Sequence, residues 1–141
     1  KDSHDQNVSL SDFKGKRVIV FFYPKDNTPG CTKEACNFKD NWEVFSKNQI
    51  IVIGISKDNS NSHQKFIEKY NLPFILLVDP IPCKVATDYE SYGLKKFMGK
   101  EYMGMIRNTF LIDAAGNIEK IYLKVKAPIM ADHIISDLSL S

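Results

Sequence analysis

The run Val18–Tyr23 (VIVFFY) is apolar at every position, with no polar residue alternating along it. Two later runs, Ile50–Ile55 (IIVIGI) and Phe74–Val78 (FILLV), have the same character. A strand shows this pattern when both of its faces are buried, as in a parallel sheet that carries helices on its faces. These runs therefore predict three strands of such a sheet.

Helical patterns fill the two intervals between these strands. One runs from about Cys31 to Ser46 and the other from about Ser60 to Tyr70, and in each the apolar side chains recur on one stripe. The stripes comprise Cys31, Ala35, Phe38, Trp42 and Phe45 in the first helix and His63, Phe66, Ile67 and Tyr70 in the second. The predicted order is strand, helix, strand, helix, strand.

The second half of the chain predicts smaller elements. A short helix is expected over Lys84–Tyr92, followed by an irregular loop over Gly93–Gly104, which is rich in Gly, Lys and aromatic residues. A hairpin is expected next, with strands Asn108–Asp113 and Ile118–Val125. The Gly-Asn pair within Ala114–Asn117 supplies the turn between them.

The closing segment Pro128–Leu140 is expected to be a helix, because proline suits the first helical position. Its apolar face would carry Ile134, Ile135 and Leu138. Together these elements predict an α/β protein of the thioredoxin-like class, with a central mixed β-sheet flanked by helices. The length and the lack of any linker-like segment predict one domain over residues 1–141.

The composition argues against several functions. The net charge is only +2 and the lysines are scattered, so nucleic-acid binding is not expected. No apolar stretch reaches the roughly 18 residues that a membrane helix needs, which predicts a soluble protein. Three cysteines do not suggest a secreted disulfide framework and favour the cytoplasm. Because the chain begins at Lys1 rather than Met, an organelle is the alternative if a leader has been removed.

The chemically informative stretch is residues 23–36, YPKDNTPGCTKEAC, which joins the first predicted strand to the first predicted helix. It lies at the carboxyl end of a parallel strand, where open α/β sheets bind ligands. Thr28 suits the N-cap and Pro29 the first helical position, which places Cys31 in the first turn. Backbone N–H groups and the helix dipole favour an anion there, so the pKa of Cys31 is expected to be lowered.

Cys31 has a second interpretation, because its place on the apolar stripe also suits a small packing residue. The preceding Pro29 and Gly30 and the Thr28 cap argue against it. They build an anion site, which a packing cysteine does not need. Cys31 is therefore expected to be a nucleophilic thiolate.

Pro24, Thr28 and Cys31 reproduce the PxxxTxxC motif of the peroxiredoxins. The longer run YPKDNTPGCTKEAC resembles the subgroup called peroxiredoxin Q or bacterioferritin comigratory protein. The resemblance continues through VSLSDFKGK, SKDN, FIEKYNLPF, KKFMGKEYMGM and RNTFLID, and so covers nearly the whole chain. It implies a monomer. It also implies an incomplete N-terminal strand, because the family usually has a further strand before VSLSDF.

The resemblance places Cys31 at the peroxidatic position and Arg107 at the family's active-site arginine. The Thr28 hydroxyl is then expected to hydrogen-bond the thiolate or the peroxide. A guanidinium has a fixed charge and a fork of donors, which suits a thiolate, a peroxide and the charge on the leaving oxygen. Without the resemblance, Arg107 would be interpreted as a solvated residue at the end of a strand.

Neighbouring residues complete the expected pocket. Pro24 and Pro29 lack an N–H group and are expected to shape and shield it, with simple turn formation as the alternative. Gly30 lies between Pro29 and the nucleophile. Glu34 lies one turn further along and is expected to hold the arginine, with an exposed helix glutamate as the alternative.

Cys36 is expected to lie about 140° around the helix from the apolar stripe, at about 100° per residue. Its face would be shared with Asp40, Glu43 and Lys47, which argues against a core position. Its thiol is therefore expected to attack the sulfenic acid of Cys31. That step closes an intramolecular disulfide and prevents further oxidation of the sulfur.

The other cysteine and the histidines predict no further site. Cys83 departs from what the resemblance leads one to expect in its loop, and it is interpreted as a bystander. The histidines are widely spaced and no CxxC motif occurs, so no metal site is expected. His63 is interpreted as a packed or capping residue.

The resemblance implies a thiol-dependent peroxidase that reduces hydrogen peroxide and organic hydroperoxides without metal, haem or flavin. Electrons would come from thioredoxin or a related dithiol protein, which reduces the Cys31–Cys36 disulfide. A disulfide reductase of the thioredoxin type is disfavoured, because the spacing here is Cys-x-x-x-x-Cys. The alternative is a redox sensor that passes oxidation to a protein partner, and turnover with free thioredoxin distinguishes the two.

Overall fold

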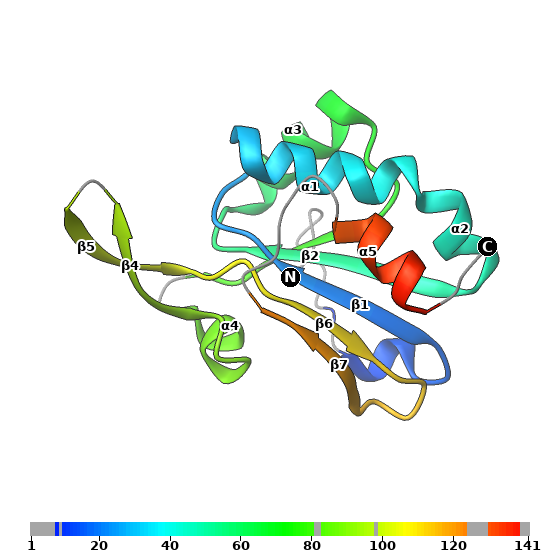
Figure 1. Cartoon of the computed structure of the whole chain (residues 1–141). Coiled ribbons are helices and arrows are strands. Elements are labelled where there is room, and N and C mark those ends of the chain that lie inside the picture. The colour runs from blue at the N-terminus through cyan, green and yellow to red at the C-terminus, as the bar shows by residue number, and fades with distance from the viewer. Residues whose placement is uncertain (1–7, 9, 81–82, 98, 124–129, 139–141) are drawn as a thin grey trace.

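The computed structural model of the protein describes residues 8, 10–80, 83–97, 99–123 and 130–138. A five-stranded sheet in the order β3-β2-β1-β6-β7 lies at its centre (Figure 1). The strands are β1 Arg17–Phe22, β2 Ile50–Ser56, β3 Ile75–Val78, β6 Thr109–Ile112 and β7 Ile118–Tyr122. β1, β2 and β3 pair in parallel, whereas β6 and β7 are antiparallel, so the sheet is mixed as predicted.

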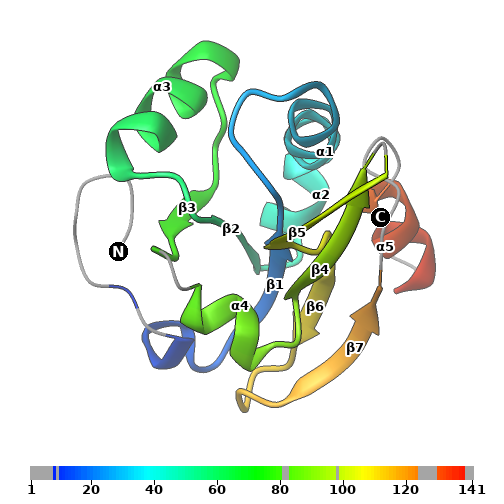
Figure 2. The same ribbon diagram turned by 90° about the vertical axis from the view of Figure 1, so that its left-hand side faces the viewer.

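Helices cover both faces of this sheet (Figures 1 and 2). One face carries α1 Pro29–Asp40, α2 Trp42–Lys47, α3 Ser60–Tyr70 and α5 Met130–Asp137. The other carries α4 Lys84–Asp88 and the short 3-10 helix η1 Leu10–Phe13. None of the described helices is long and apolar enough to cross a bilayer.

The burial of β1 explains why its sequence lacks alternation. Ile19 and Phe21 face the core beneath α1, whereas Val18, Val20 and Phe22 face a second core beneath α4. Both surfaces of the strand are therefore buried. The interpretation of the apolar runs as strands covered on both faces is confirmed.

The helix predicted over residues 31–46 is instead two helices, divided at Asn41. The Asn41 side chain donates from Nδ2 to the carbonyl of Asn37 at 2.9 Å, which satisfies a carbonyl at the end of α1. The chain then changes direction and α2 begins. The second predicted helix, Ser60–Tyr70, has the bounds that the sequence predicts.

Residues 93–97 and 99–104, within the segment predicted as an irregular loop, belong to an antiparallel hairpin. Its strands are β4 Tyr92–Phe97 and β5 Lys100–Met105, and Figure 1 shows it extending away from the central sheet. Gly99 forms the turn with a left-handed backbone at φ 79°. The prediction was wrong because glycines and lysines, which are depleted in strands, mask the strand pattern here.

The remaining elements lie close to their predicted positions. α4 ends at Asp88 rather than at the predicted Tyr92, and Glu90 follows it with a left-handed backbone at φ 54°. β6 and β7 form the predicted hairpin, and α5 is the predicted closing helix. Residues 124–129 and 139–141, which include the predicted helix start at Pro128, lie outside the described residues.

Candidate active site

Cys31 lies in the first turn of α1. Thr28 is the N-cap with extended backbone, φ −87° and ψ 155°, and the N–H of Thr32 donates to its carbonyl at 2.8 Å. Pro29 lies in the first turn, so the predicted helix start is correct. The Thr28 hydroxyl makes no capping hydrogen bond to the helix. It donates to the carbonyl of Lys25 at 2.9 Å. The positive field of the uncapped helix end is therefore available to the Cys31 sulfur.

Arg107 lies between β5 and β6 and reaches α1 with both ends of its guanidinium. Nη2 is 3.3 Å from Cys31 Sγ, and Nη1 donates to Glu34 Oε1 at 2.9 Å. Cys31 and Glu34 are buried, at 1% and 0% exposure, whereas the Arg107 side chain retains 19%. The structure thus brings these three sequence-predicted residues together, and it places Glu34 in the interior rather than on an exposed helix face.

Gly30 leaves room for the guanidinium. A Cβ atom at this position would lie 3.1 Å from Arg107 Nη2, which is tighter than ordinary van der Waals contact. Any larger side chain would therefore press on the group that contacts the Cys31 sulfur. Gly30 was expected in the pocket because it lies between Pro29 and Cys31, and its close approach to Arg107 is a feature that only the fold reveals.

The structure describes the side chain of Pro24 but not that of Pro29. Pro24 lies in the loop between β1 and α1 and is half-buried. Pro29 belongs to the backbone of α1, but its side chain lies outside the described residues. Its predicted shielding of the pocket therefore stays a prediction.

The two carboxyl oxygens of the buried Glu34 differ in their hydrogen bonding. Oε1 accepts from Arg107, but Oε2 has no hydrogen-bond partner among the described residues. Burial raises the pKa of Glu34 to about 7, although the charge and hydrogen bond of Arg107 oppose this shift. Burial alone would lower the pKa of Arg107. The charges of Glu34 and Cys31 outweigh it and raise that pKa, so the guanidinium stays protonated.

This shift gives the protein a pH-dependent stability of defined sign. Between pH 4.5 and about 7, Glu34 is ionised in the unfolded chain but still protonated in the folded one, so rising pH favours unfolding. The whole effect is at most roughly 3 kcal/mol. Glu34→Gln should remove this part of the pH dependence in urea unfolding at pH 5 and pH 8, while the exposed Glu68→Gln should keep it. An unchanged slope in Glu34→Gln would contradict the assignment.

Cys36 lies further along α1 and is partly exposed, outside both cores, as the helical periodicity predicts. Burial raises the pKa of its thiol and the charge of Asp40 adds to this, while Lys39 opposes it. Glu43 and Lys47 do not share its helix face as predicted, because they belong to α2.

Asp26 was missed by the sequence analysis. This buried carboxylate lies in the loop between β1 and α1 and is 2.7 Å from Nδ1 of His63 in α3. His63 is buried, as its place on an apolar stripe predicts. A contact between residues 37 positions apart leaves no local sequence signal, so only the fold reveals the pair.

Cys83 lies on the opposite side of the sheet from Cys31, in the core beneath α4. It precedes α4 with a left-handed backbone at φ 58°, and burial, followed by the charge of Asp79, raises the pKa of its thiol. Its interpretation as a bystander stays a prediction. In the described part of the chain, no group of three or more His, Cys, Asp or Glu residues could hold a metal ion.

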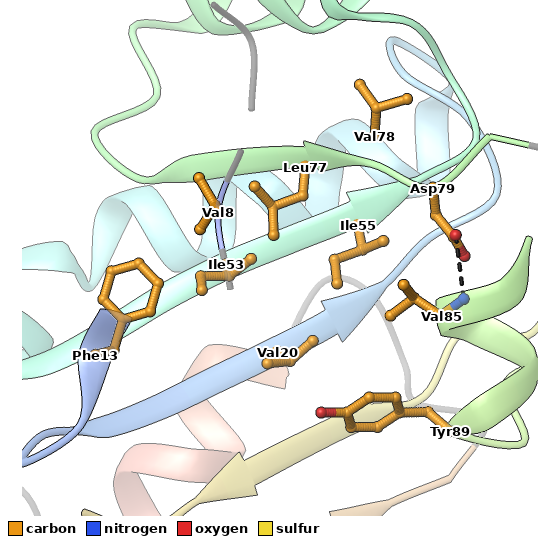
Figure 3. A pocket seen from close by; sticks show the side chains of 10 residues that line it. All are labelled: Val8, Phe13, Val20, Ile53, Ile55, Leu77, Val78, Asp79, Val85 and Tyr89. Carbon is orange, nitrogen blue, oxygen red and sulfur yellow. Dashed lines mark hydrogen bonds between the residues drawn. The ribbon is translucent and has the colours of Figure 1, made fainter. Parts of the chain in front are cut away.

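A cavity of about 230 Å³ is lined in part by side chains of the core beneath α4 (Figure 3). Cys83 belongs to the same core. The Asp79 carboxylate at the edge of the cavity is engaged in accepting the N–H of Val85 at 3.1 Å. The cavity is lined by Val8, Phe13, Val20, Ile53, Ile55, Leu77, Val78, Asp79, Val85 and Tyr89. None of the predicted site residues is among them, so this cavity is separate from the thiol site.

The reactive group that this fold presents is a sulfur atom. A cysteine at a helix start beside a fixed positive charge is the arrangement that favours a thiolate, so the fold and site define a thiol-based redox protein of the thioredoxin-like class. The model of the AhpC/TSA family matches residues 1–121. The chain belongs to this family, the peroxiredoxins, and is a peroxidase that reduces peroxides at the expense of thiols.

Relatives and solved structures agree with this assignment. Peroxiredoxin Bcp of Bacillus subtilis is 49% identical over 138 residues, covering 98% of this chain and 85% of that protein. A putative peroxiredoxin bcp of Coxiella burnetii is 54% identical over 122 residues, covering 84% and 78%. The structure of Xanthomonas campestris bacterioferritin comigratory protein matches with a TM-score of 0.91 at 29% identity, covering 99% and 88%. The predicted subgroup and the thioredoxin-like fold are confirmed.

Proposed function

We propose that the protein reduces hydroperoxides with Cys31 as the attacking thiolate. The contact of 3.3 Å between Cys31 Sγ and Arg107 Nη2, at the start of α1, carries this proposal. The thiolate attacks one peroxide oxygen and the O–O bond breaks. The other oxygen takes up a proton and leaves as water or an alcohol, and Cys31 becomes a sulfenic acid.

Arg107 acts on both sides of this step. Its charge stabilises the thiolate beforehand, and its donors orient the peroxide and stabilise the charge that develops on the leaving oxygen. Glu34 holds the guanidinium through Nη1, which leaves Nη2 directed at the sulfur. Glu34 is therefore a positioning residue in this proposal.

Thr28 and the small residues beside it complete the pocket. The Thr28 hydroxyl donates to Lys25, so in this arrangement its oxygen is free to accept a hydrogen bond from a peroxide O–H. To donate to the thiolate, the hydroxyl would have to give up the Lys25 carbonyl. Pro24 and Pro29 shape the entrance, and Gly30 keeps the space for the guanidinium.

Cys36 resolves the sulfenic acid. Its thiol loses its proton and attacks Cys31 Sγ, the S–O bond breaks, and the sulfenic oxygen takes up a proton and leaves as water, so that a Cys31–Cys36 disulfide forms. A dithiol protein, thioredoxin or a relative of it, then reduces the disulfide by thiol exchange and leaves oxidised itself. The partial exposure of Cys36 supports this role, because the reductant must reach one of the two sulfur atoms.

The substrates include organic hydroperoxides as well as hydrogen peroxide. The solved structures of the Xanthomonas campestris relative were described for its alkyl peroxide reduction activity, and this supports the same substrate class here. The bacterial relatives support a cytoplasmic location. As the subgroup resemblance implies, the enzyme acts as a monomer.

A steady-state assay tests the complete cycle. Loss of hydrogen peroxide and of an alkyl hydroperoxide is followed with thioredoxin, thioredoxin reductase and NADPH. Sustained turnover is expected with both peroxides. If Cys31 is oxidised but no turnover with free thioredoxin occurs, the protein is a redox sensor that passes oxidation to another partner.

Replacing Arg107 with alanine should slow the oxidation of Cys31 by about a hundredfold, because a donor to the developing charge is lost. It should also raise the pKa of the Cys31 thiol, since a positive charge beside the thiolate is removed. Arg107→Lys should recover only part of the rate, because an ammonium lacks the two-pronged geometry. Single-turnover kinetics and a thiolate titration measure both effects. Values equal to those of the unmodified protein would exclude this role.

A further inference from the structure

Asp26, in the middle of the loop between β1 and α1, makes several polar contacts. Tyr23 donates its hydroxyl to Oδ1 at 2.5 Å and Ser62 donates its hydroxyl to Oδ2 at 2.8 Å. His63 Nδ1 lies 2.7 Å from Oδ2. The backbone N–H of Asp26 donates to Asp58 Oδ2 at 2.7 Å. With 6% exposure, the Asp26 carboxylate is a buried anchor for the loop rather than a surface charge.

His63 extends this anchor to the sheet. Its Nε2 lies 2.9 Å from the carbonyl oxygen of Leu77 in β3. A carbonyl only accepts, so Nε2 must carry a hydrogen. At 2.7 Å the contact between Nδ1 and the Asp26 carboxyl is a hydrogen bond, and either of the two atoms can be its donor. The loop is therefore tied to α3 and, through the imidazole, to β3.

The position of this anchor bears on the proposed chemistry. Asp26 precedes the helix cap Thr28 by two residues and Cys31 by five. Among the described residues, the hydroxyl of Thr28 bonds only to Lys25 of the same loop, so this bond does not fix the loop to another element. A displacement of the loop would move the start of α1 relative to Arg107, which comes from a different part of the chain. Errors of about 1 Å in such a geometry reduce rates by up to about a hundredfold.

We propose that Asp26 and His63 form a clamp that holds the start of α1 against Arg107, and that they act as positioning residues for the oxidation of Cys31. The proposal rests on the proposed role of Cys31 as nucleophile. Each hydrogen bond described for the two side chains goes to the loop, to α3 or to β3, so they act through the position of the helix. A buried pair that merely stabilises the fold would instead leave the rate per folded molecule unchanged.

The test compares Asp26→Ala and His63→Ala in stopped-flow oxidation of Cys31 by hydrogen peroxide, with rates divided by the folded fraction. Each substitution should lower the rate at least about tenfold. The double variant should lose little more than either single one, because both side chains act as one unit. Asp79→Ala is the matched control: it removes a buried carboxylate that caps α4 in the other core, and it should leave the rate unchanged.

Asp26→Asn tests for rescue. Its amide can donate to Nδ1 of a neutral His63 while its oxygen accepts from Tyr23, so the clamp is retained without a negative charge. Most of the rate should return. A rate per folded molecule equal to the unmodified protein in Asp26→Ala, or an equal loss in Asp79→Ala, would overturn the proposal. If Asp26→Ala does not fold, His63→Gln, which can keep only one of the two imidazole contacts, takes its place.

Hydrogen exchange separates failure of the clamp from failure of the proposed function. In Asp26→Ala, backbone amides of residues 23–32 should exchange faster, while those of α5 should not. If Cys31 of the unmodified protein proves not to react with peroxide, the proposed function fails, and exchange still decides whether the clamp holds the loop. Unchanged exchange in residues 23–32 would overturn the clamp even if the peroxidase chemistry is correct.

Discussion

The Cys31→Ser variant is expected to show no peroxide reduction above background. A serine hydroxyl is not ionised near neutral pH, and the field of the helix end and Arg107 cannot lower its pKa far enough to make it a comparable nucleophile. Because serine occupies nearly the same volume, circular dichroism should show the fold retained. Peroxide consumption with a dithiol reductant measures the loss. Residual turnover at more than background level would mean that another group attacks the peroxide.

Cys36→Ser should behave differently from Cys31→Ser. Its Cys31 should still be oxidised once, at the unmodified rate, because the helix start and Arg107 are untouched. Turnover supported by thioredoxin should then be lost, since no thiol is left to resolve the sulfenic acid. Cys83→Ser serves as the control and should change neither step, because Cys83 lies in the other core. Normal thioredoxin-linked turnover in Cys36→Ser would remove Cys36 from the mechanism.

The sheet could be predicted because burial on both faces leaves a strong pattern. The run around β1 is apolar on each side of the strand, and the same holds for much of β2. The break at Asn41 and the hairpin of residues 92–105 could not be predicted in this way. One depends on a single side chain bonding to its own helix, and the other on strands rich in glycine and lysine. In the first case a local hydrogen bond ends a helix whose apolar pattern continues, and in the second case the strands lack the apolar pattern on which the prediction depends.

From the residues alone, the candidate site could be predicted only where its members lie close together in the sequence. Thr28, Pro29 and Cys31 lie within four residues of sequence, so their arrangement at a helix start follows from capping preferences. Arg107 entered through the resemblance, because nothing in its own surroundings indicates a contact with a residue 76 positions away. The contact between Asp26 and His63 was indicated neither by neighbouring residues nor by the resemblance, so it could be found only in the structure.

Closing the Cys31–Cys36 disulfide is expected to unwind the start of α1. In an intact helix, residues five positions apart have Cα atoms roughly 8.7 Å apart, and their side chains point about 140° apart. A disulfide requires Cα atoms within about 4.4–6.8 Å. Both cysteines belong to α1, so the bond cannot form while residues 31–36 remain helical. The intervening residues must leave helical geometry.

The unwinding would also dismantle the peroxide site. Glu34 lies between the two cysteines, so moving it breaks its ion pair with Arg107, and Cys31 itself moves away from Nη2. Ala35 would leave the core beneath α1, which adds to the loosening. The oxidised enzyme would thus expose its disulfide to the reductant while the peroxide pocket is disabled. Reduction would let the helix re-form and restore the site.

Hydrogen exchange over residues 29–40 measures this opening. In the oxidised protein, the amides of the first turns of α1 should lose their protection and exchange at the rate of an unstructured peptide, because their helical hydrogen bonds are broken. α3 should keep its protection and serves as the internal control. Cys36→Ser oxidised at Cys31 separates the effect of the disulfide from that of the sulfenic acid, and it should remain protected. Equal protection of α1 in both redox states, with the Cys31–Cys36 bond confirmed by mass spectrometry, would contradict the coupling between catalysis and local unfolding.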